Sequence, residues 1–273
     1  MINWFPGHMA KQFRLLKEKQ KLFDLFIILL DSRLPLSSFN PEIFEIAKNK
    51  KILFIFNKID LTNLTRLKQI TNQYKEKGEV ILTNLKSKDA FAKINSIINK
   101  YYLESKKRND LKNKLTPPLK CVVVGMPNVG KSTLINLLKK SKVAKVGAMA
   151  GVTRSEQWIN CKNYMLLDTP GLLMPKIEGD IGPKLALVGS ISKDAISLNE
   201  FIVEIYKVVS KYFPEKIEEI KLKPSFSEEE IYEQIYEHAK NSNFLLKGNE
   251  LDFNKSANNL INYFSNLTNV IYD

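Results

Sequence analysis

The chain has 273 residues, of which 44% are hydrophobic, and this size and composition fit one large folded domain with a smaller one, not a disordered protein. No apolar run approaches the roughly 20 residues that cross a bilayer, and the first seven residues lack the pattern of a signal peptide. The two cysteines, Cys121 and Cys161, have no neighbouring Cys or His at metal-ligand spacing. We therefore expect a cytoplasmic protein with reduced cysteines, the alternative being a single disulfide.

Positive charge is concentrated in the first part of the chain. The net charge is +13, but residues up to Lys176 include 32 Lys and Arg against 13 Asp and Glu, a net charge of +19, and the remainder carries −6. A field of this size attracts polyanions, which favours contact with nucleic acid over a merely solvated surface. Only five of the basic residues are Arg, so a lysine bias from an AT-rich genome is the other explanation.

Five short apolar runs predict strands, and each ends at a polar residue or a glycine. They are Phe26–Leu30 before Asp31, Ile52–Phe56 before Asn57, Val80–Leu82 before Thr83, Cys121–Val124 before Gly125, and Tyr164–Leu167 before Asp168. Such runs suit strands that are covered on both faces, as in a parallel sheet. The amphipathic stretches between them predict helices at Pro41–Asn49, Leu64–Lys77, Ala90–Tyr102 and Ser132–Lys140. This alternation predicts a doubly wound α/β domain that binds ligands at the carboxyl ends of its strands.

The character of the sequence changes after Pro175. The charged stretch Lys106–Pro118 is expected to be a connector inside the α/β part. Three later amphipathic segments predict helices at Leu198–Tyr212, Ser227–Lys240 and Lys255–Asn266. We therefore expect an α/β domain over residues 1–176 and a small helical domain over residues 177–273, beginning somewhere between Pro175 and Leu198.

The strongest motif is GMPNVGKS at residues 125–132, which has the form GxxxxGK[ST] of a phosphate-binding loop. Its glycines permit a tight turn whose backbone N–H groups surround phosphates at a helix N-terminus. Lys131 supplies a positive charge to the β- and γ-phosphates, and the Ser132 hydroxyl is offered to Mg²⁺. The strand before it and the helix after it argue against a glycine-rich turn without a ligand. The expected phosphate-binding residues are Asn128, Val129, Gly130, Lys131, Ser132 and Thr133.

A second motif, DTPG at residues 168–171, follows a strand 37 residues after Lys131. Asp168 is expected to hold the water shell of Mg²⁺, and the Gly171 amide to bond the γ-phosphate and so report its presence. Thr153 lies between the two motifs, where a mobile threonine would complete the Mg²⁺ shell, the alternative being an ordinary loop residue. Lys131 and Thr153 are accordingly candidate catalytic residues.

A third motif, NKID at residues 57–60, identifies the base. The Asp60 carboxylate can accept hydrogen bonds from N1 and N2 of guanine, which adenine cannot supply, so the motif favours GTP over ATP. Asn57 is expected to tie this loop to the phosphate loop, and the stem of Lys58 to cover the base. A second base-contacting loop is expected at Thr83, Asn84 and Leu85, through its backbone and with its contacts open by one or two positions.

The motifs occur in an unusual order, because NKxD precedes the phosphate loop and DxxG, whereas Ras-like GTPases have the phosphate loop first and NKxD last. This order resembles the circularly permuted GTPases. The segments WFPGHMAK at 4–11, DSRLPLSSFNP at 31–41 and LMPK at 173–176 resemble the ribosome biogenesis GTPase A family, also called YlqF. The resemblance implies a circularly permuted Ras-like P-loop domain with a mostly parallel sheet, followed by a small all-α domain.

The resemblance also implies a function. It indicates a factor for a late step of large (50S) ribosomal subunit maturation that binds GTP, GDP, ribosomal RNA and ribosomal proteins, and whose GTP hydrolysis the ribosome stimulates. We expect no membrane contact and a monomer away from the ribosome. The acidic tail departs from the expectation of a basic RNA-binding appendage. The alternative is a GTP-gated RNA or protein docking module with little intrinsic turnover.

Catalysis and cofactors complete the expectations. Leu172 stands where Ras-like enzymes place the glutamine that positions the attacking water, which favours the docking module for the isolated chain. The resemblance implicates His8 instead, although His8 alone would be interpreted as a surface residue at a helix start. The cofactors implied are Mg²⁺ and K⁺, the latter because Asn128 resembles a potassium-binding asparagine of related GTPases. Since DTPG directly precedes the helical domain, we expect loss of the γ-phosphate to reorient that domain.

Overall fold

The computed structural model describes residues 8–139, 158–169, 177, 179–191 and 197–273, with side chains from Phe13 onward. Its centre is a six-stranded sheet in the order β3-β2-β1-β4-β6-β5. All neighbouring strands are parallel except β5, which pairs antiparallel to β6. The strands are β1 (Leu25–Asp31), β2 (Lys51–Asn57), β3 (Glu79–Leu82), β4 (Leu119–Gly125), β5 (Trp158–Asn160) and β6 (Tyr164–Asp168).

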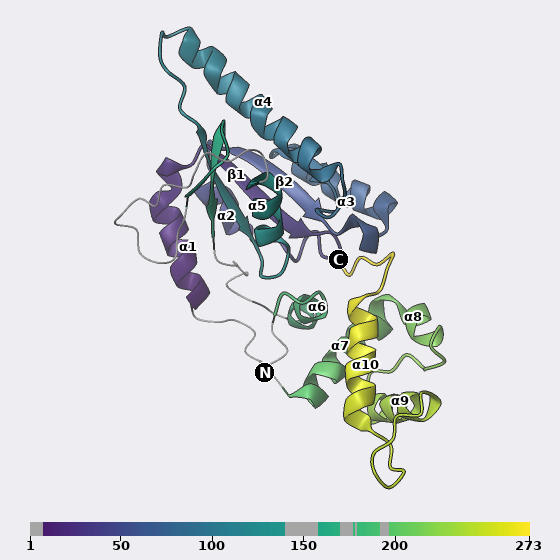
Figure 1. Cartoon of the computed structure of the whole chain (residues 1–273). Coiled ribbons are helices and arrows are strands. Elements are labelled where there is room, and N and C mark those ends of the chain that lie inside the picture. The colour runs from purple at the N-terminus through teal and green to yellow at the C-terminus, as the bar shows by residue number, and fades with distance from the viewer. Residues whose placement is uncertain (1–7, 140–157, 170–176, 178, 192–196) are drawn as a thin grey trace.

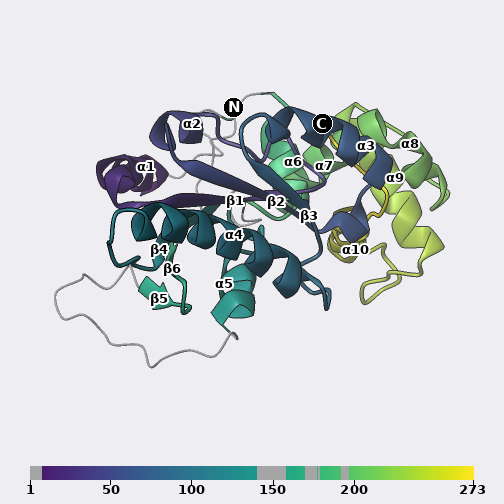
Figure 2. The ribbon, with the colours of Figure 1, turned by 90° about the horizontal axis from the view of Figure 1, so that it is seen from above.

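Helices cover both faces of the sheet, as Figure 2 shows. They are α1 (His8–Lys19), α2 (Glu42–Ile46), α3 (Leu64–Lys75), α4 (Ala90–Asp110) and α5 (Lys131–Lys139), with short 3-10 turns η1 (Gln20–Leu22) and η2 (Ile59–Leu61). Alternate residues of β1 separate the two cores: Phe26 packs with the side of α1, α2 and α3, whereas Ile27 packs with the side of α4 and α5. Both strand faces are therefore buried, which explains the continuous apolar runs.

The remaining helices form a second group beside the sheet (Figure 1). They are α6 (Ile181–Leu187), α7 (Leu198–Tyr212), α8 (Pro214–Glu218), α9 (Glu228–Asn241) and α10 (Phe253–Ser265). Ser197 and Ser227 start α7 and α9 with capping boxes, in which serine and the glutamate three residues later satisfy each other's backbone amides. Leu34 and Met126 of the α/β part are fully buried within this helical core. We call residues 181–273 the helical part.

The last residues return from α10 to the α/β part, and the C-terminus lies near α3 in Figure 1. The Val270 amide donates to the Leu61 carbonyl (3.1 Å), and the Tyr272 amide donates to the Arg33 carbonyl (2.9 Å). Ile271 joins the core on the α1–α3 face of the sheet. The tail therefore connects the helical part with the sheet by both backbone bonds and apolar packing.

The predicted fold class is confirmed, and the five predicted strands are found. One prediction is wrong: residues from Lys106 to Asp110 are not a connector, because α4 continues through them. These residues include lysines and arginine, which have high helix propensity. The edge strand β5 and the helices α6 and α8 were not predicted, and α1 was anticipated only by the interpretation of His8 as a residue at a helix start. The domain division at residue 176 remains a prediction, with α6 beginning at Ile181.

The structure also describes the two cysteines and the lengths of the apolar helices. Cys121 and Cys161 are both free and buried. Among the described residues, no helix is long and apolar enough to span a bilayer.

Candidate functional site

The predicted motifs lie close together at the carboxyl end of the sheet. Each of them follows a parallel strand, and the ends of neighbouring strands are in register. Asp31 at the end of β1 pairs with Asn57 at the end of β2, and Leu29 of β1 pairs with Gly125 at the end of β4. Val123 of β4 pairs with Asp168 at the end of β6. The carboxyl ends of β2, β4 and β6 thus bring the NKID, phosphate-loop and DTPG motifs together, as expected for ligand binding in such sheets.

The phosphate loop connects β4 to α5 through two positions that need glycine. A Cβ at Gly125 would lie 2.4 Å from the Leu29 carbonyl oxygen, and a Cβ at Gly130, where φ is +110°, would lie 2.7 Å from Nδ2 of Asn57. Helix α5 begins at Lys131, so the first-turn amides of Lys131, Ser132 and Thr133 lie at its N-terminus. That arrangement attracts phosphate.

Lys131 points back along the loop. Its Nζ donates to the Met126 carbonyl (2.8 Å) and to the Gly125 carbonyl (3.2 Å). Burial lowers the pKa of Lys131 to about 8, and the carboxylate of Asp168 opposes that shift. A phosphate would supply the negative charge that the buried amine lacks.

Ser132 and Asp168 provide oxygen atoms suited to a hard cation. Burial raises the pKa of Asp168, while Lys131 and the Thr169 amide act in the opposite direction. Within the described part of the chain, Oδ1 of Asp168 is buried without a hydrogen-bond partner, whereas Oγ1 of Thr169 donates to the Val123 carbonyl (2.7 Å). An unsatisfied carboxylate oxygen at the end of β6 fits a Mg²⁺ ion with its water shell, and Ser132 follows Lys131, whose charge acts on Asp168.

Asn57 joins three loops. Its Nδ2 donates to the Val129 carbonyl of the phosphate loop (2.8 Å), and its Oδ1 accepts from the Leu85 amide (3.0 Å). The tie to the phosphate loop is the contact expected from the sequence. The bond to Asn57 fixes the position of the second base loop. The Leu85 amide therefore points toward Asn57 and not outward. Thr83 is buried, and the side chain of Asn84 accepts from the Lys86 amide (2.9 Å).

Lys58 and Asp60 directly follow β2 at the carboxyl end of the sheet, where the base is expected to bind. Lys58 adopts a left-handed backbone conformation with φ of +64°, and its Nζ donates to Oδ2 of Asp31 (2.8 Å). The side chain of Asp60 is exposed in η2, where a ligand can reach it.

Asp31 and Arg33 were quoted from the sequence only for their family resemblance, and no site role was predicted for them. The structure buries both and joins them by a bidentate ion pair of 3.0 and 2.9 Å. Burial alone would raise the pKa of Asp31, but Arg33 and Lys58 together lower it below its usual value. The sequence did contain a signal for Asp31, because the DTPG motif also begins with an acidic residue directly after an apolar strand.

The phosphate loop also contacts the helical part. The Asn128 side chain, on a residue with φ of +57°, donates from Nδ2 to the Gly189 carbonyl after α6 (2.7 Å). Its Oδ1 is the atom that a monovalent cation would use. Of the other candidates, Thr153 and Gly171 lie outside the described residues, as does Leu172, and His8 is described only as the first residue of the α1 backbone.

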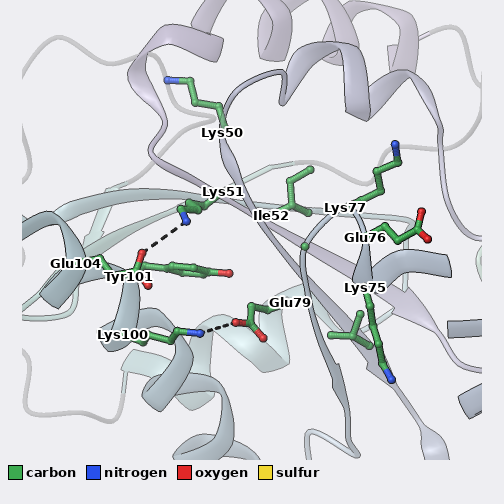
Figure 3. A pocket seen from close by; sticks show the side chains of 12 residues that line it. Lys50, Lys51, Ile52, Lys75, Glu76, Lys77, Glu79, Lys100, Tyr101 and Glu104 are labelled. Atoms are coloured by element: carbon green, nitrogen blue, oxygen red, sulfur yellow. Dashed lines mark hydrogen bonds and ion pairs between the residues drawn. The ribbon is translucent and has the colours of Figure 1, made fainter. Parts of the chain in front are cut away.

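A groove of about 570 Å³ lies at the opposite edge of the sheet, beside the amino ends of β2 and β3 (Figure 3). Ion pairs join Lys51 to Glu104 (3.5 Å) and Lys100 to Glu79 (2.6 Å). Its lysines, which define what we call the lysine groove, are Lys50, Lys51, Lys75, Lys77 and Lys100. The nucleotide motifs lie at the carboxyl ends of the strands, so this groove is a separate surface.

Comparison with known proteins decides the family. The chain is 38% identical to ribosome biogenesis GTPase A of Bacillus cereus over 94% of this chain and 88% of the relative. It is 37% identical to the protein of the same name from Priestia megaterium, over 94% and 90% of the two chains. This chain belongs to the ribosome biogenesis GTPase A family.

Family models and a solved structure agree with this membership. Residues 43–178 match a model described as RsgA GTPase, and residues 120–246 match one described as 50S ribosome-binding GTPase. The fold is similar to a crystal structure of GNP-bound YlqF from T. maritima, with a TM-score of 0.64 over 96% of this chain and 97% of that one at 22% identity. The chain is thus a circularly permuted GTPase that hydrolyses GTP to GDP and phosphate. Such GTPases use Mg²⁺, which the oxygens of Ser132 and Asp168 fit.

Proposed function

We propose that this GTPase acts in a late step of large (50S) ribosomal subunit maturation and that the ribosome stimulates its hydrolysis. The names of its relatives support the ribosomal role, and the convergence of the NKID, phosphate-loop and DTPG motifs at the carboxyl ends of β2, β4 and β6 supports the switch on which it depends. We infer that it works in the cytoplasm, as a monomer away from the ribosome.

The arrangement of the site supports a separate role for each of its residues. The amides at the start of α5 and Lys131 hold the phosphates, and Asp60 reads guanine while Lys58 covers it. Ser132, Asp168 and Thr153 hold Mg²⁺, which would neutralise the charge that develops on the phosphates during hydrolysis. The Gly171 amide senses the γ-phosphate. Thr83, Asn84 and Leu85 form the second base-contacting loop, and the bond from the Leu85 amide to Asn57 holds this loop against the NKID motif.

The experiment for this function is co-sedimentation with mature and precursor large subunits in the presence of a GTP analogue or GDP. We expect tight binding to precursors with the analogue and release with GDP. Equal binding in both states, or binding to small subunits only, would contradict the proposal.

His8 is the proposed residue that positions the attacking water on the ribosome. The proposal rests on the family resemblance of the FPGHM segment and on Leu172 standing where Ras-like enzymes have glutamine. The variant His8→Ala should lose most ribosome-stimulated turnover while keeping GTP affinity. Full stimulated turnover in this variant would exclude the role. The alternative function, a docking module with little turnover, predicts that subunits leave the rate of hydrolysis unchanged.

Potassium dependence is proposed through Asn128. The bond from its Nδ2 to the Gly189 carbonyl orients the amide and leaves Oδ1 to coordinate a cation beside the phosphates. Hydrolysis should be faster in potassium than in sodium at equal ionic strength. Equal rates in the two salts would reject this assignment.

Ribosomal RNA is the proposed partner of the lysine groove, with ribosomal proteins contacting other surfaces. The α/β part carries the positive charge, and two of the groove's five lysines form the ion pairs with Glu104 and Glu79. A second hollow along α4 adds Lys106 and Lys107 and shares Lys100 with the groove, so the basic surface extends along this helix. Such a surface suits the phosphate backbone of RNA without blocking the nucleotide edge.

Charge reversal tests this surface. The triple variant Lys50→Glu, Lys75→Glu, Lys77→Glu should weaken binding to a ribosomal RNA fragment. The slope of log K against log salt concentration should fall by about one for each phosphate that the variant no longer neutralises. The matched control reverses three exposed lysines of the helical part, Lys223, Lys240 and Lys247. An equally weakened affinity in both variants would indicate non-specific attraction. Competition by an acidic peptide but not by RNA would point to a protein partner.

A further inference from the structure

The guanine loop is linked to the helical part through a short chain of buried charges. Oδ1 of Asp31 accepts the backbone amide and Nε of Arg33, both at 3.0 Å. Oδ2 accepts Nη2 of Arg33 (2.9 Å) and Nζ of Lys58 (2.8 Å). The two carboxylate oxygens thus accept four hydrogen bonds, and Asp31 holds the base-covering lysine and the arginine together.

Arg33 carries the connection across to the helical part. Its Nη1 donates to the carbonyl of Ser265 at the end of α10 (2.9 Å), and Nη2 also donates to the carbonyl of Val188 after α6 (3.2 Å). A planar guanidinium can bond a carboxylate and two carbonyls at once, whereas a lysine ammonium cannot reproduce this fork. These two carbonyls are available to Arg33 only while the helical part is docked.

Two further bonds cross the same interface. The Leu61 carbonyl, one residue after Asp60, accepts the Val270 amide (3.1 Å), and Asn128 of the phosphate loop donates to the Gly189 carbonyl (2.7 Å). The helical part therefore contacts both the base loop and the phosphate loop. If it moves away, Arg33 is deprived of two acceptors, and the carboxylate that orients Lys58 loses its support.

We propose that Asp31 and Arg33 are positioning residues that couple guanine-nucleotide binding to docking of the helical part. Docking orients Lys58 over the base and so slows nucleotide release, and bound nucleotide in turn keeps the helical part docked. Because such coupling is reciprocal, a partner that pulls the helical part away lowers nucleotide affinity by the factor by which nucleotide opposes that partner. The proposal rests on the assignment of residues 57–60 to guanine made above.

The test uses the full chain with the substitution Arg33→Lys. This change keeps a positive charge for Asp31 but removes the fork to Ser265 and Val188. The control is Arg66→Lys, since Arg66 donates to the carbonyl of Asp273 in the same interface (2.5 Å) but does not contact Asp31. The measurements are the dissociation rate of a fluorescent GDP and the hydrogen exchange of the Val270 and Tyr272 amides with and without GDP.

In the wild type and in the control, GDP should slow exchange at these two amides. In Arg33→Lys, GDP should dissociate about 5- to 150-fold faster, the usual range of coupling between sites, and should no longer protect the tail. Turnover at saturating GTP should change less than the affinity does, because neither residue touches the phosphates. A wild-type GDP dissociation rate would overturn the proposal, and so would full protection of the tail by GDP in the variant.

Asp31→Asn tests the pair from its other end and keeps the experiment decisive if Arg33→Lys folds poorly. The neutral amide is equal in size but loses the attraction for both cations, so GDP should again dissociate faster. Failure of the guanine assignment is recognised separately: a wild-type protein that binds GDP and ADP equally would refute that assignment whatever the variants do.

Discussion

The Lys131 amine is held by the carbonyls of Gly125 and Met126 in surroundings that burial makes unfavourable for a charge. Its pKa of about 8 lies below the usual 10.5, so the free protein loses this proton well before an unfolded chain does. Phosphate binding requires the charged amine. The protonation state of one residue therefore sets an upper pH limit for nucleotide binding.

We predict that GDP affinity is constant below about pH 8 and falls by up to tenfold per pH unit above it, with proton uptake on binding in that range. Calorimetry in buffers of different ionisation enthalpy measures this uptake. The sign for folding is the opposite, because a depressed lysine pKa makes the nucleotide-free protein gain stability as the pH rises from 8 to 10.5. An affinity that stays level to pH 10 would contradict the prediction.

Asp60 tests the identity of the base. Its exposed carboxylate is expected to accept from N1 and N2 of guanine, so Asp60→Asn should lower GTP affinity by about 10²-fold or more, since it leaves polar groups of the base unpaired. The variant should gain affinity for xanthosine nucleotides, whose base offers an acceptor at the same position. Unchanged GTP affinity would show that another residue reads the base.

At the scale of elements, the C-terminal tail is an example of structure without a local signal. Val270, Ile271 and Tyr272 are almost fully buried although they follow the last helix. Tyr272 stacks edge-on against Phe213, with ring centroids 5.3 Å apart, and its amide bonds Arg33. We expect the tail to stabilise the fold because it contacts both the helical part and the α/β part.

The substitution Tyr272→Ala should therefore lower the free energy of unfolding by about 3–5 kcal/mol, the range found when a buried aromatic side chain is removed from a core. Denaturant titration monitored by circular dichroism measures it. Tyr236→Ala is the control, because Tyr236 is an exposed tyrosine of α9, and it should change stability much less. A similar destabilisation in both variants would mean that the tail packs loosely.

Elements with a strong local pattern were predictable, and those that depend on distant partners were not. The strands ending at Asn57 and Asp168 were predicted within a residue because burial on both faces produces continuous apolar runs. The edge strand Trp158–Asn160 has three half-buried residues and exists through its pairing with β6. The bonds of Arg33 to Ser265 and Val188 span 232 and 155 positions, and no local pattern encodes them.

At the scale of the whole molecule, the docked parts depend on each other for stability, because each contributes side chains to the core of the other. Leu34 and Met126 follow β1 and β4, yet both are buried in the helical core, and Ile271 of the tail is buried in the core of the sheet. Each part thus completes the other's apolar core. The charge contrast, +19 up to Lys176 and −6 beyond it, adds attraction between them.

We predict that the two parts unfold in a single transition and that nucleotide stabilises them together. GDP at one hundred times its dissociation constant should add about 2.7 kcal/mol to the free energy of unfolding and raise the midpoint temperature by several degrees. Calorimetry with and without GDP measures both effects.

In Leu34→Ala the truncated side chain leaves a cavity at the junction of the two parts, so the temperature of the single transition should fall or the transition should split in two. Two separate transitions in the wild type, with only one shifted by GDP, would show that the parts are independent domains.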